Sequence, residues 1–168
     1  MNSSNSNITF RIIKGNRLKL INKEILQNFA SIVYNNFISL SDYPNLKHTH
    51  EEIQKILTSS NLIMICAYSN NKMIGYIIGE SMRLDDNRYV LFISYLYVGL
   101  KYRRQKLGTK LLHMITNEAI QNKINYIMLI ADTEDSKIVN FYMMEGFMYD
   151  AYLRRYDKYD VFTLDISV

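Results

Sequence analysis

The sequence contains few of the residues that cross-link a chain or interrupt regular structure. Its 168 residues include one cysteine, one proline, six glycines and no tryptophan. A single cysteine excludes an intramolecular disulfide and fits a reducing compartment, so we expect a cytoplasmic protein, with the nucleus as an alternative. Cys66 lies in the apolar stretch 61–69, which favours a small buried hydrophobe over a nucleophile. The scarcity of proline and glycine excludes collagen-like and linker-rich chains.

Long apolar runs and strong charge are missing as well. No run reaches transmembrane length, and residues 1–7 are polar without the features of a signal peptide, so we expect a soluble protein without a membrane partner. The net charge of +4 suits an anionic ligand but is too small to indicate nucleic acid by itself. The histidines, His48, His50 and His113, are scattered, so we expect no metal site. Residues 1–7 are predicted to be a disordered tail.

The apolar pattern of residues 8–168 predicts a single domain, because no linker or repeat divides the chain. Helical spacing indicates four helices, the second opened by the capping box Thr49-His-Glu-Glu52 and the last ended by Gly146. The predicted helices span residues 23–37, 50–57, 107–121 and 135–144.

Alternating or continuous apolar runs bounded by turn residues predict the strands. They span residues 8–14, 62–68, 73–82, 89–98 and 126–131, with two more in 147–166 around Asp157-Lys158; residues 39–47, which contain Pro44, form a loop. The strand–helix–strand section 89–131 demands a parallel pair, whereas the hairpins are antiparallel. The predicted fold is a mixed α/β, mostly antiparallel central sheet with helices on both faces, in the order β-α-α-β-β-β-α-β-α-β-β.

Residues 98–112 carry the clearest chemical signal, because a strand runs through a basic loop straight into an amphipathic helix. The first turn of a helix has unpaired amides and the positive end of the macrodipole, and both favour a phosphate. Arg103, Arg104 and Lys106 add charge, Thr109 adds a hydroxyl, and Gly108 lets a ligand approach the backbone. A nucleic-acid or nuclear-localisation patch and a merely solvated loop remain alternatives.

Two motifs in this chain resemble those of the GNAT acetyltransferase superfamily, in particular of protein N-terminal acetyltransferase catalytic subunits. The first is Arg103-Arg-Gln-Lys-Leu-Gly108, preceded by Leu96-Tyr-Val98, and it is similar to Arg/Gln-x-x-Gly-x-Gly/Ala. The second, Asp135-Ser-Lys-Ile-Val-Asn-Phe-Tyr142-Met-Met-Glu-Gly-Phe147, is similar to Asn-x-x-Ala-x-x-Phe-Tyr-x-x-x-Gly-Phe.

The resemblance implies acetyl-coenzyme A as co-substrate, bound where the strands ending near Val98 and Ala131 separate. Backbone groups of Leu96 to Val98 would hold the pantetheine arm and polarise the thioester, and amides of the basic loop would bind the pyrophosphate. Tyr142 would protonate the departing thiolate, although a core aromatic is the alternative for an isolated tyrosine. The implied coenzyme contacts are Leu96, Tyr97, Val98, Arg103, Arg104, Gln105, Lys106, Leu107, Gly108, Thr109, Asp135 and Tyr142.

The chain departs from the family pattern at two positions of these motifs. Lys106 replaces the first loop glycine; a lysine can adopt helical dihedral angles and adds a charge, but it could also crowd the backbone. Asp135 replaces asparagine, either as a coenzyme contact or only as a helix N-cap.

The general base is the third departure. Where relatives place Glu or Tyr on the long strand and His on the next, this chain has Phe92, Ser94 and Ile130. The candidates for the catalytic base are Glu80, Tyr95 and Tyr97, and the alternative for Glu80 is a solvated residue near a turn.

The hairpin expected over residues 152–160 would border the groove for the acceptor amine. Tyr156 and Tyr159 resemble tyrosines that peptide-acetylating relatives present to their substrates. Asp157 and Asp160 would attract a cationic amine, whereas Arg154 and Arg155 would oppose a polyamine.

The hypothesis is an N-acetyltransferase that acts by direct attack in a ternary complex, on a protein or peptide amine first and a small-molecule amine second. A non-catalytic GNAT-fold module that binds coenzyme A or a protein partner is the alternative, suggested by Lys106 and the missing strand carboxylate. Nucleic-acid binding through the Arg103–Lys106 loop is the least favoured. Both a monomer and a homodimer are compatible with the sequence.

Overall fold

A seven-stranded sheet forms the centre of the protein, with its strands in the order β1-β2-β3-β4-β5-β7-β6. The computed structural model describes residues 7–20, 22–38, 46 and 48–167, so the expected tail and the expected loop at 39–47 lie outside the described residues except for Asn7 and Leu46. All neighbouring strands pair antiparallel except β4 and β5, which are parallel. The strands are β1 (Ile8–Lys14), β2 (Leu62–Ser69), β3 (Lys72–Arg83), β4 (Tyr89–Val98), β5 (Tyr126–Asp132), β6 (Met148–Tyr149) and β7 (Tyr159–Asp165).

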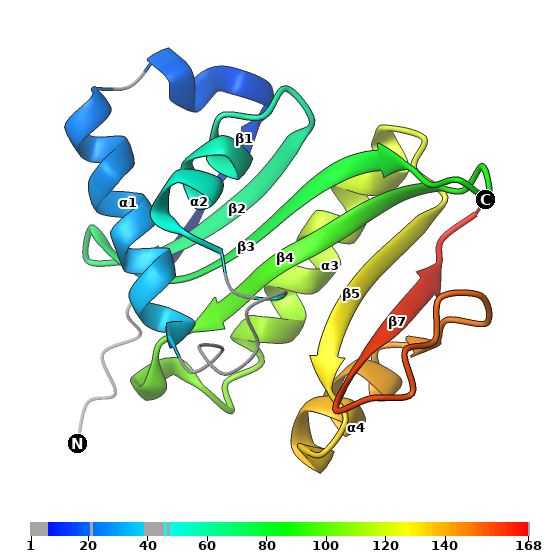
Figure 1. Ribbon diagram of the computed structural model, residues 1–168. Coiled ribbons are helices and arrows are strands. Elements are labelled where there is room, and N and C mark those ends of the chain that lie inside the picture. Colours follow the sequence, from blue (N-terminus) through cyan, green and yellow to red (C-terminus); the bar gives the residue numbers. More distant parts are fainter. Residues whose placement is uncertain (1–6, 21, 39–45, 47, 168) are drawn as a thin grey trace, which may run out of the picture.

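In the described part of the chain, four α-helices cover the two faces of this sheet. Helices α1 (Lys23–Asn36) and α2 (His50–Leu57) lie on one face, and α3 (Leu107–Gln121) and α4 (Ser136–Met144) lie on the other (Figure 1). Each face has its own apolar core. Short 3-10 helices at Gly15–Leu20 and Leu100–Tyr102 were not predicted. The predicted fold class and element order are confirmed.

The predicted start of α2 is confirmed in atomic detail. The Glu52 amide donates to the Thr49 hydroxyl at 3.2 Å, and the Thr49 amide donates to the Glu52 carboxylate at 2.7 Å. Two amides that the helix leaves unpaired are thereby satisfied by side chains. No helix in the described part of the chain is long and apolar enough to span a bilayer.

The prediction of a hairpin over residues 152–160 is wrong. Only β6 and β7 pair, and residues 150–158 form no strand. Two buried carboxylates accept hydrogen bonds from backbone amides there. Asp150 accepts from the amides of Tyr152 and Leu153 at 2.9 and 2.8 Å. Asp160 accepts from the amide of Arg155 at 2.7 Å. These side-chain bonds replace a ladder between strands, which is the usual way that aspartate competes with regular structure.

Candidate active site

The parallel pair of β4 and β5 ends early, and the two strands then separate. Backbone pairing joins Val90–Ile93 to Tyr126–Leu129 and stops there. Immediately afterwards the register between β3 and β4 shifts: Gly79 pairs with Ile93 and Ile78 with Tyr95, so Ser94 is an extra residue in β4. A bulge bends its strand, and β4 accordingly diverges from β5 towards its end (Figure 1). The separation expected from the family resemblance is present.

The bulge also exchanges the faces of the β4 side chains. Before it, Ile93 packs in the core on the α3 side; after it, Leu96 and Val98 pack on that side, whereas Tyr95 and Tyr97 point to the α1/α2 side. One inserted residue changes the alternation because side chains in a strand repeat every two residues. The gap is therefore lined by Leu96 and Val98 on one face and by tyrosines on the other.

Two backbone amides of β4 face the gap. The Gly99 amide donates to the Ile74 carbonyl at 2.8 Å, so it points to β3. Alternation along an antiparallel strand then directs the backbone groups of Tyr97 to β3 and those of Leu96 and Val98 to the gap. Of the three residues predicted to hold pantetheine, Leu96 and Val98 can do so through their amides. The backbone of Tyr97 is used in the sheet, and its ring stacks on Tyr76 with centroids 5.5 Å apart.

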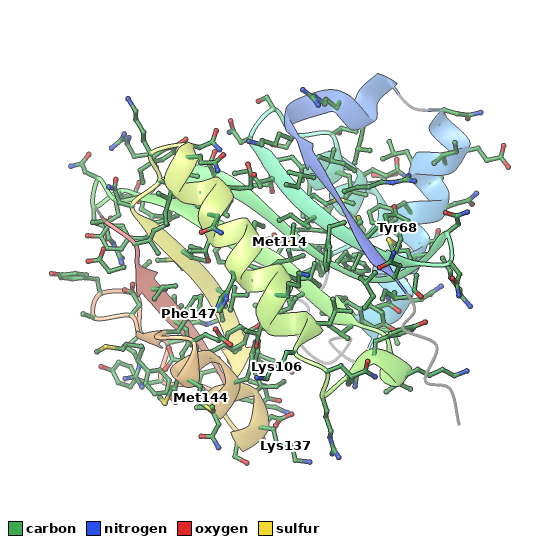
Figure 2. All side chains as sticks on the ribbon, turned by 180° about the vertical axis from the view of Figure 1, so that it is seen from behind. Tyr68, Lys106, Met114, Lys137, Met144 and Phe147 are labelled. Atoms are coloured by element: carbon green, nitrogen blue, oxygen red, sulfur yellow. The ribbon has the colours of Figure 1, made fainter. Side chains whose placement is uncertain are left out.

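The N-terminus of α3 is open. Lys106 is its N-cap residue and provides no side-chain cap, and the first helical bond runs from the Lys110 amide to the Lys106 carbonyl at 2.9 Å. The amides of Leu107, Gly108 and Thr109 thus have no partner within the described residues. Figure 2 shows Lys106 at the beginning of this helix. Together with the helix dipole, these amides have the geometry that favours an anion.

The backbone of Lys106 differs from our expectation. Its φ of 59° is left-handed rather than right-handed helical, and Arg104 has φ 61°. The glycine that the family pattern places at the Lys106 position adopts such a conformation without a steric penalty, whereas a lysine pays about 1 kcal/mol. The lysine keeps the turn that the glycine would favour and projects its charge from it.

The other predicted loop side chains are of two kinds: some donate hydrogen bonds to backbone carbonyls of the loop, and the others are exposed cations. Arg103 donates from Nε to the Val98 carbonyl at 2.9 Å, and Gln105 donates to the Lys101 carbonyl at 2.9 Å. Both side chains stabilise the loop conformation. Arg104 and Lys106 are exposed and leave their charge available to a phosphate.

Thr109 makes a contact that the sequence did not indicate. Its hydroxyl donates to the Glu145 carboxylate at 2.7 Å, and His113 Nε2 lies 2.7 Å from the same carboxylate. The predicted role of Thr109 in phosphate binding therefore rests on its amide, because its hydroxyl connects α3 to the end of α4. No local pattern signals this cluster, since Glu145 lies 36 residues from Thr109 in the chain.

Asp135 and Tyr142 occupy opposite ends of α4. Asp135 accepts from the amides of Lys137 and Ile138 at 2.9 and 3.3 Å, so it is the N-cap. Tyr142 is half-buried, and its ring meets those of Phe141 and Phe147 edge-on at 5.0 and 5.5 Å. Burial raises the pKa of Tyr142 to about 12, so its hydroxyl keeps its proton at neutral pH.

The family model of the Acetyltransferase (GNAT) family matches residues 30–147, which include the gap, the α3 N-terminus and α4. The chain belongs to this family. A comparison with curated protein sequences finds no match.

Solved structures of GNAT proteins share the fold at low sequence identity. Arabidopsis thaliana NAA60 in complex with acetyl-CoA is 15% identical with a TM-score of 0.66, covering 95% of this chain and 99% of that chain. The Escherichia coli ribosomal-protein-S18-alanine N-acetyltransferase is 16% identical with a TM-score of 0.66, covering 95% and 96%. An aminoglycoside acetyltransferase from an uncultured soil metagenomic sample is 19% identical with a TM-score of 0.59, covering 82% and 86%.

The face of the GNAT sheet opposite α3 carries the candidate base residues. Gly79 points its missing side chain towards Leu91 and Ile93, so Glu80 lies on the other face, half-buried, across from Phe92. Tyr95 is 4% exposed on that same face. Its hydroxyl is hydrogen-bonded to Nδ1 of His48, a residue that no local sequence pattern marked as functional.

Two of the residues expected to face the acceptor are buried instead. Asp160 is 1% exposed and receives a hydrogen bond from Arg154 Nε at 2.7 Å, so it cannot attract an amine. Tyr159 is also buried at the start of β7, whereas Tyr156 and Asp157 are exposed. The described residues contain no group of three or more His, Cys, Asp or Glu side chains that could hold a metal ion.

Proposed function

We propose that this GNAT protein is an acetyl-coenzyme A-dependent N-acetyltransferase that acts on a primary amine by direct attack in a ternary complex. The observation that carries the proposal is the continuity of open donors across the gap. The amides of Leu96 and Val98 face the gap, and the uncapped first turn of α3 begins just beyond the loop that Val98 enters. An extended acyl-pantetheine chain ending in a pyrophosphate matches this arrangement of amides.

The binding half of the activity follows from these amides. The α3 amides would hold the pyrophosphate, with Arg104 and Lys106 adding charge from the exposed loop. Leu96 or Val98 would donate to the thioester carbonyl oxygen, where negative charge develops when the amine attacks. Because these donors belong to a strand and a helix, little reorganisation is needed during the reaction.

The chemical half involves Tyr142. When the tetrahedral intermediate collapses, the C–S bond breaks and the leaving thiolate needs a proton. A neutral tyrosine hydroxyl can donate that proton at any physiological pH, because the pKa of Tyr142 is about 12. On the opposite face, the half-buried carboxylate of Glu80 would attract the cationic acceptor.

We propose a protein or peptide amine as the first choice of acceptor and a small-molecule amine as the second. The similar structures include NAA60 with a bisubstrate analogue, an enzyme named for a ribosomal-protein alanine, and aminoglycoside acetyltransferases, so both classes have precedent on this fold. Exposed Tyr152 and Tyr156 on the loop after β6 offer aromatic surface to a peptide chain. The proposed location is the cytoplasm.

Titration calorimetry with acetyl-coenzyme A, followed by a thiol-release assay, tests the proposal. The acceptors are peptides with free N-termini, the same peptides with blocked N-termini as matched controls, a polyamine and an aminoglycoside. We expect binding, and thiol release that depends on a free amine. Binding without acceptor-dependent release would instead support a non-catalytic coenzyme A module, and absence of binding would overturn both readings.

A further inference from the structure

His48 and Tyr95 form a polar pair on the face of the sheet that α1 and α2 cover. Nδ1 of His48 is hydrogen-bonded to the Tyr95 hydroxyl, and the two rings meet edge-on with centroids 5.6 Å apart. Tyr95 also packs against Phe37, at 4.9 Å between ring centroids. A buried hydroxyl needs a partner to offset its desolvation, and His48 supplies it.

The pair stands at the edge of the gap. Tyr95 directly follows the bulge residue Ser94, where β4 leaves β5, and it points to the α1/α2 face. Tyr142 and the first turn of α3 belong to the opposite face. If the coenzyme occupies the α3 side, an amine must approach the thioester from the side on which His48 lies. This step rests on the proposed function.

On the face from which the amine would approach, β4 itself supplies no side chain that can accept a proton. Phe92 has no titratable group, and the serine hydroxyl of Ser94 is not basic. Burial is the largest cause that raises the pKa of Tyr95 above its usual range, and the neighbouring Tyr76 and Glu52 raise it further. Tyr95 therefore keeps its proton near neutral pH and is not a base by itself. An imidazole is the side chain best suited to accept a proton near neutral pH.

We propose that His48, oriented by Tyr95, is the general base of the acetyl transfer. In this assignment Nδ1–H donates to the Tyr95 hydroxyl oxygen, which leaves the lone pair of Nε2 free. The bound ammonium group of the acceptor first loses one proton to solvent. The resulting neutral amine loses a second proton to Nε2, directly or through one water, as its electron pair forms the C–N bond to the acetyl carbon. The C–S bond breaks, the electron pair leaves with sulfur, and the thiolate takes a proton from Tyr142. His48 then releases its proton to solvent, and Tyr142 regains one.

Among the described residues, titratable groups lie on the elements packed around the pair. Glu52, in the first turn of α2, interacts electrostatically with both members, and hydrogen bonds from Thr49 hold its pKa below the usual value. Tyr76 on β3 is the second, and its pKa is raised chiefly by burial. Glu80 is the third, on the same face of β3 and two residues beyond Ile78, the partner of Tyr95. Of these, Glu80 is the rival base.

Four variants separate these roles. His48→Gln removes the base, Tyr95→Phe removes its orienting partner, Glu80→Gln removes the rival, and His50→Gln is the matched control. His50 is exposed and stacks on Tyr34 at 4.1 Å between ring centroids, two residues along the chain from His48. The readouts are kcat/KM for the acceptor against pH, acetyl-coenzyme A affinity by calorimetry, and thermal unfolding.

We expect kcat/KM of the wild type to fall on the acid side as an imidazole gains its proton. His48→Gln should lose that limb and about 100-fold in rate, while Tyr95→Phe should keep the limb at a shifted pH with about a tenfold loss. His50→Gln should match the wild type. Coenzyme affinity should stay unchanged in all four, because their side chains lie on the other face.

A chemical rescue guards against a purely structural effect. In His48→Ala, added imidazole should restore turnover in proportion to its concentration, which a misfolded protein would not show. The proposal would be overturned by an unchanged pH profile in His48→Gln, or by loss of the acid limb in Glu80→Gln instead. Either result would leave the proposed acetyltransferase activity intact. A wild type that binds acetyl-coenzyme A but acetylates no amine would overturn the proposed function together with this inference.

Discussion

Ile93 and Leu129 form the last backbone pair between β4 and β5, and the bulge at Ser94 follows at once. The two observations have one consequence. Because the bulge bends β4 where its parallel partner ends, the strand keeps its bonds to β3 and turns a free edge towards the gap. The amides of Leu96 and Val98 on that edge are the donors that we propose for coenzyme binding.

Tyr142→Phe should abolish most turnover without affecting coenzyme binding. Removing the hydroxyl removes the acid for the thiolate, so we expect kcat to fall about 100-fold while the Kd for acetyl-coenzyme A stays within about twofold. Because the pKa of Tyr142 is raised to about 12, wild-type kcat should show no loss from ionisation of this group below about pH 11. Thiol release measured against pH checks both statements.

A matched control is Tyr149→Phe, which removes a hydroxyl from an aromatic that packs on Phe162 at 4.5 Å between ring centroids. Its turnover should equal that of the wild type. Equal turnover for Tyr142→Phe as well would assign Tyr142 to packing alone.

Lys106 allows the backbone and charge effects to be separated. Lys106→Gly and Lys106→Ala both remove the charge, but only glycine relieves the left-handed φ of 59°. In urea unfolding, Lys106→Gly should be more stable than Lys106→Ala by about 1 kcal/mol. Both should weaken acetyl-coenzyme A binding severalfold at low salt and less at high salt, because the charge is exposed. Equal stability of the two variants would show that the left-handed turn is not populated in solution.

Gly75 and Gly108 should respond differently to an added methyl group. A Cβ on Gly75 would lie 2.9 Å from the Tyr97 carbonyl oxygen, which β3–β4 pairing holds in place. Gly75→Ala should therefore cost about 2 kcal/mol of unfolding free energy. A Cβ on Gly108 would have its nearest neighbour, Phe141, at 3.7 Å, so Gly108→Ala should leave stability within about 0.5 kcal/mol. Chemical denaturation measures both, and similar losses would contradict the geometry.

Asp150 links the loop after β6 to the β3–β4 turn. Arg88 Nη1 lies 2.5 Å from its carboxylate, and the Thr163 hydroxyl donates to it at 2.6 Å. Although burial acts to raise it, these hydrogen bonds and two backbone amides hold the pKa of Asp150 well below its usual range. Asp150→Asn should cost about 3 kcal/mol at pH 7.

The pH dependence of that loss has a defined sign. Since the folded pKa of Asp150 is depressed, its stabilisation is complete above the unfolded value of about 4 and disappears as the pH falls towards the folded value. Wild type and Asp150→Asn should therefore converge in stability only below about pH 4. Asp86→Asn is the control, because Asp86 pairs with the same Arg88 at 2.8 Å but is more exposed, and it should cost clearly less than Asp150→Asn. Equal losses for both variants would contradict this assignment.

Cys66 should be unreactive while the protein is folded. Burial raises the pKa of its thiol from 9.0 to about 12, which lowers the thiolate fraction about a thousandfold at pH 8. We expect one thiol to react with a disulfide reagent in urea and almost none in buffer. Because the folded pKa is raised, this group stabilises the fold below about pH 9 and loses that effect as the pH rises towards 12. Rapid labelling of native protein would contradict the burial.

Local patterns in the sequence determined the elements and the coenzyme motifs. The capping box at Thr49, the helical stripe behind Leu107 and the continuous apolar strand before Asp132 each depend on neighbours a few residues away, and all are present in the structure. The two motifs identified the family for the same reason, since each is a short segment with fixed spacing.

Contacts between distant segments were decided only by the tertiary structure. The bulge at Ser94 depends on the register between two strands, and the hydrogen bond between Thr109 and Glu145 joins residues 36 apart in the chain. His48 meets Tyr95 across 47 residues of chain, a separation at which no periodicity acts. The apolar pattern along the chain predicts secondary structure, because it depends on residues a few positions apart. The partner of a buried polar group is known only when the folded sheet brings the two residues together.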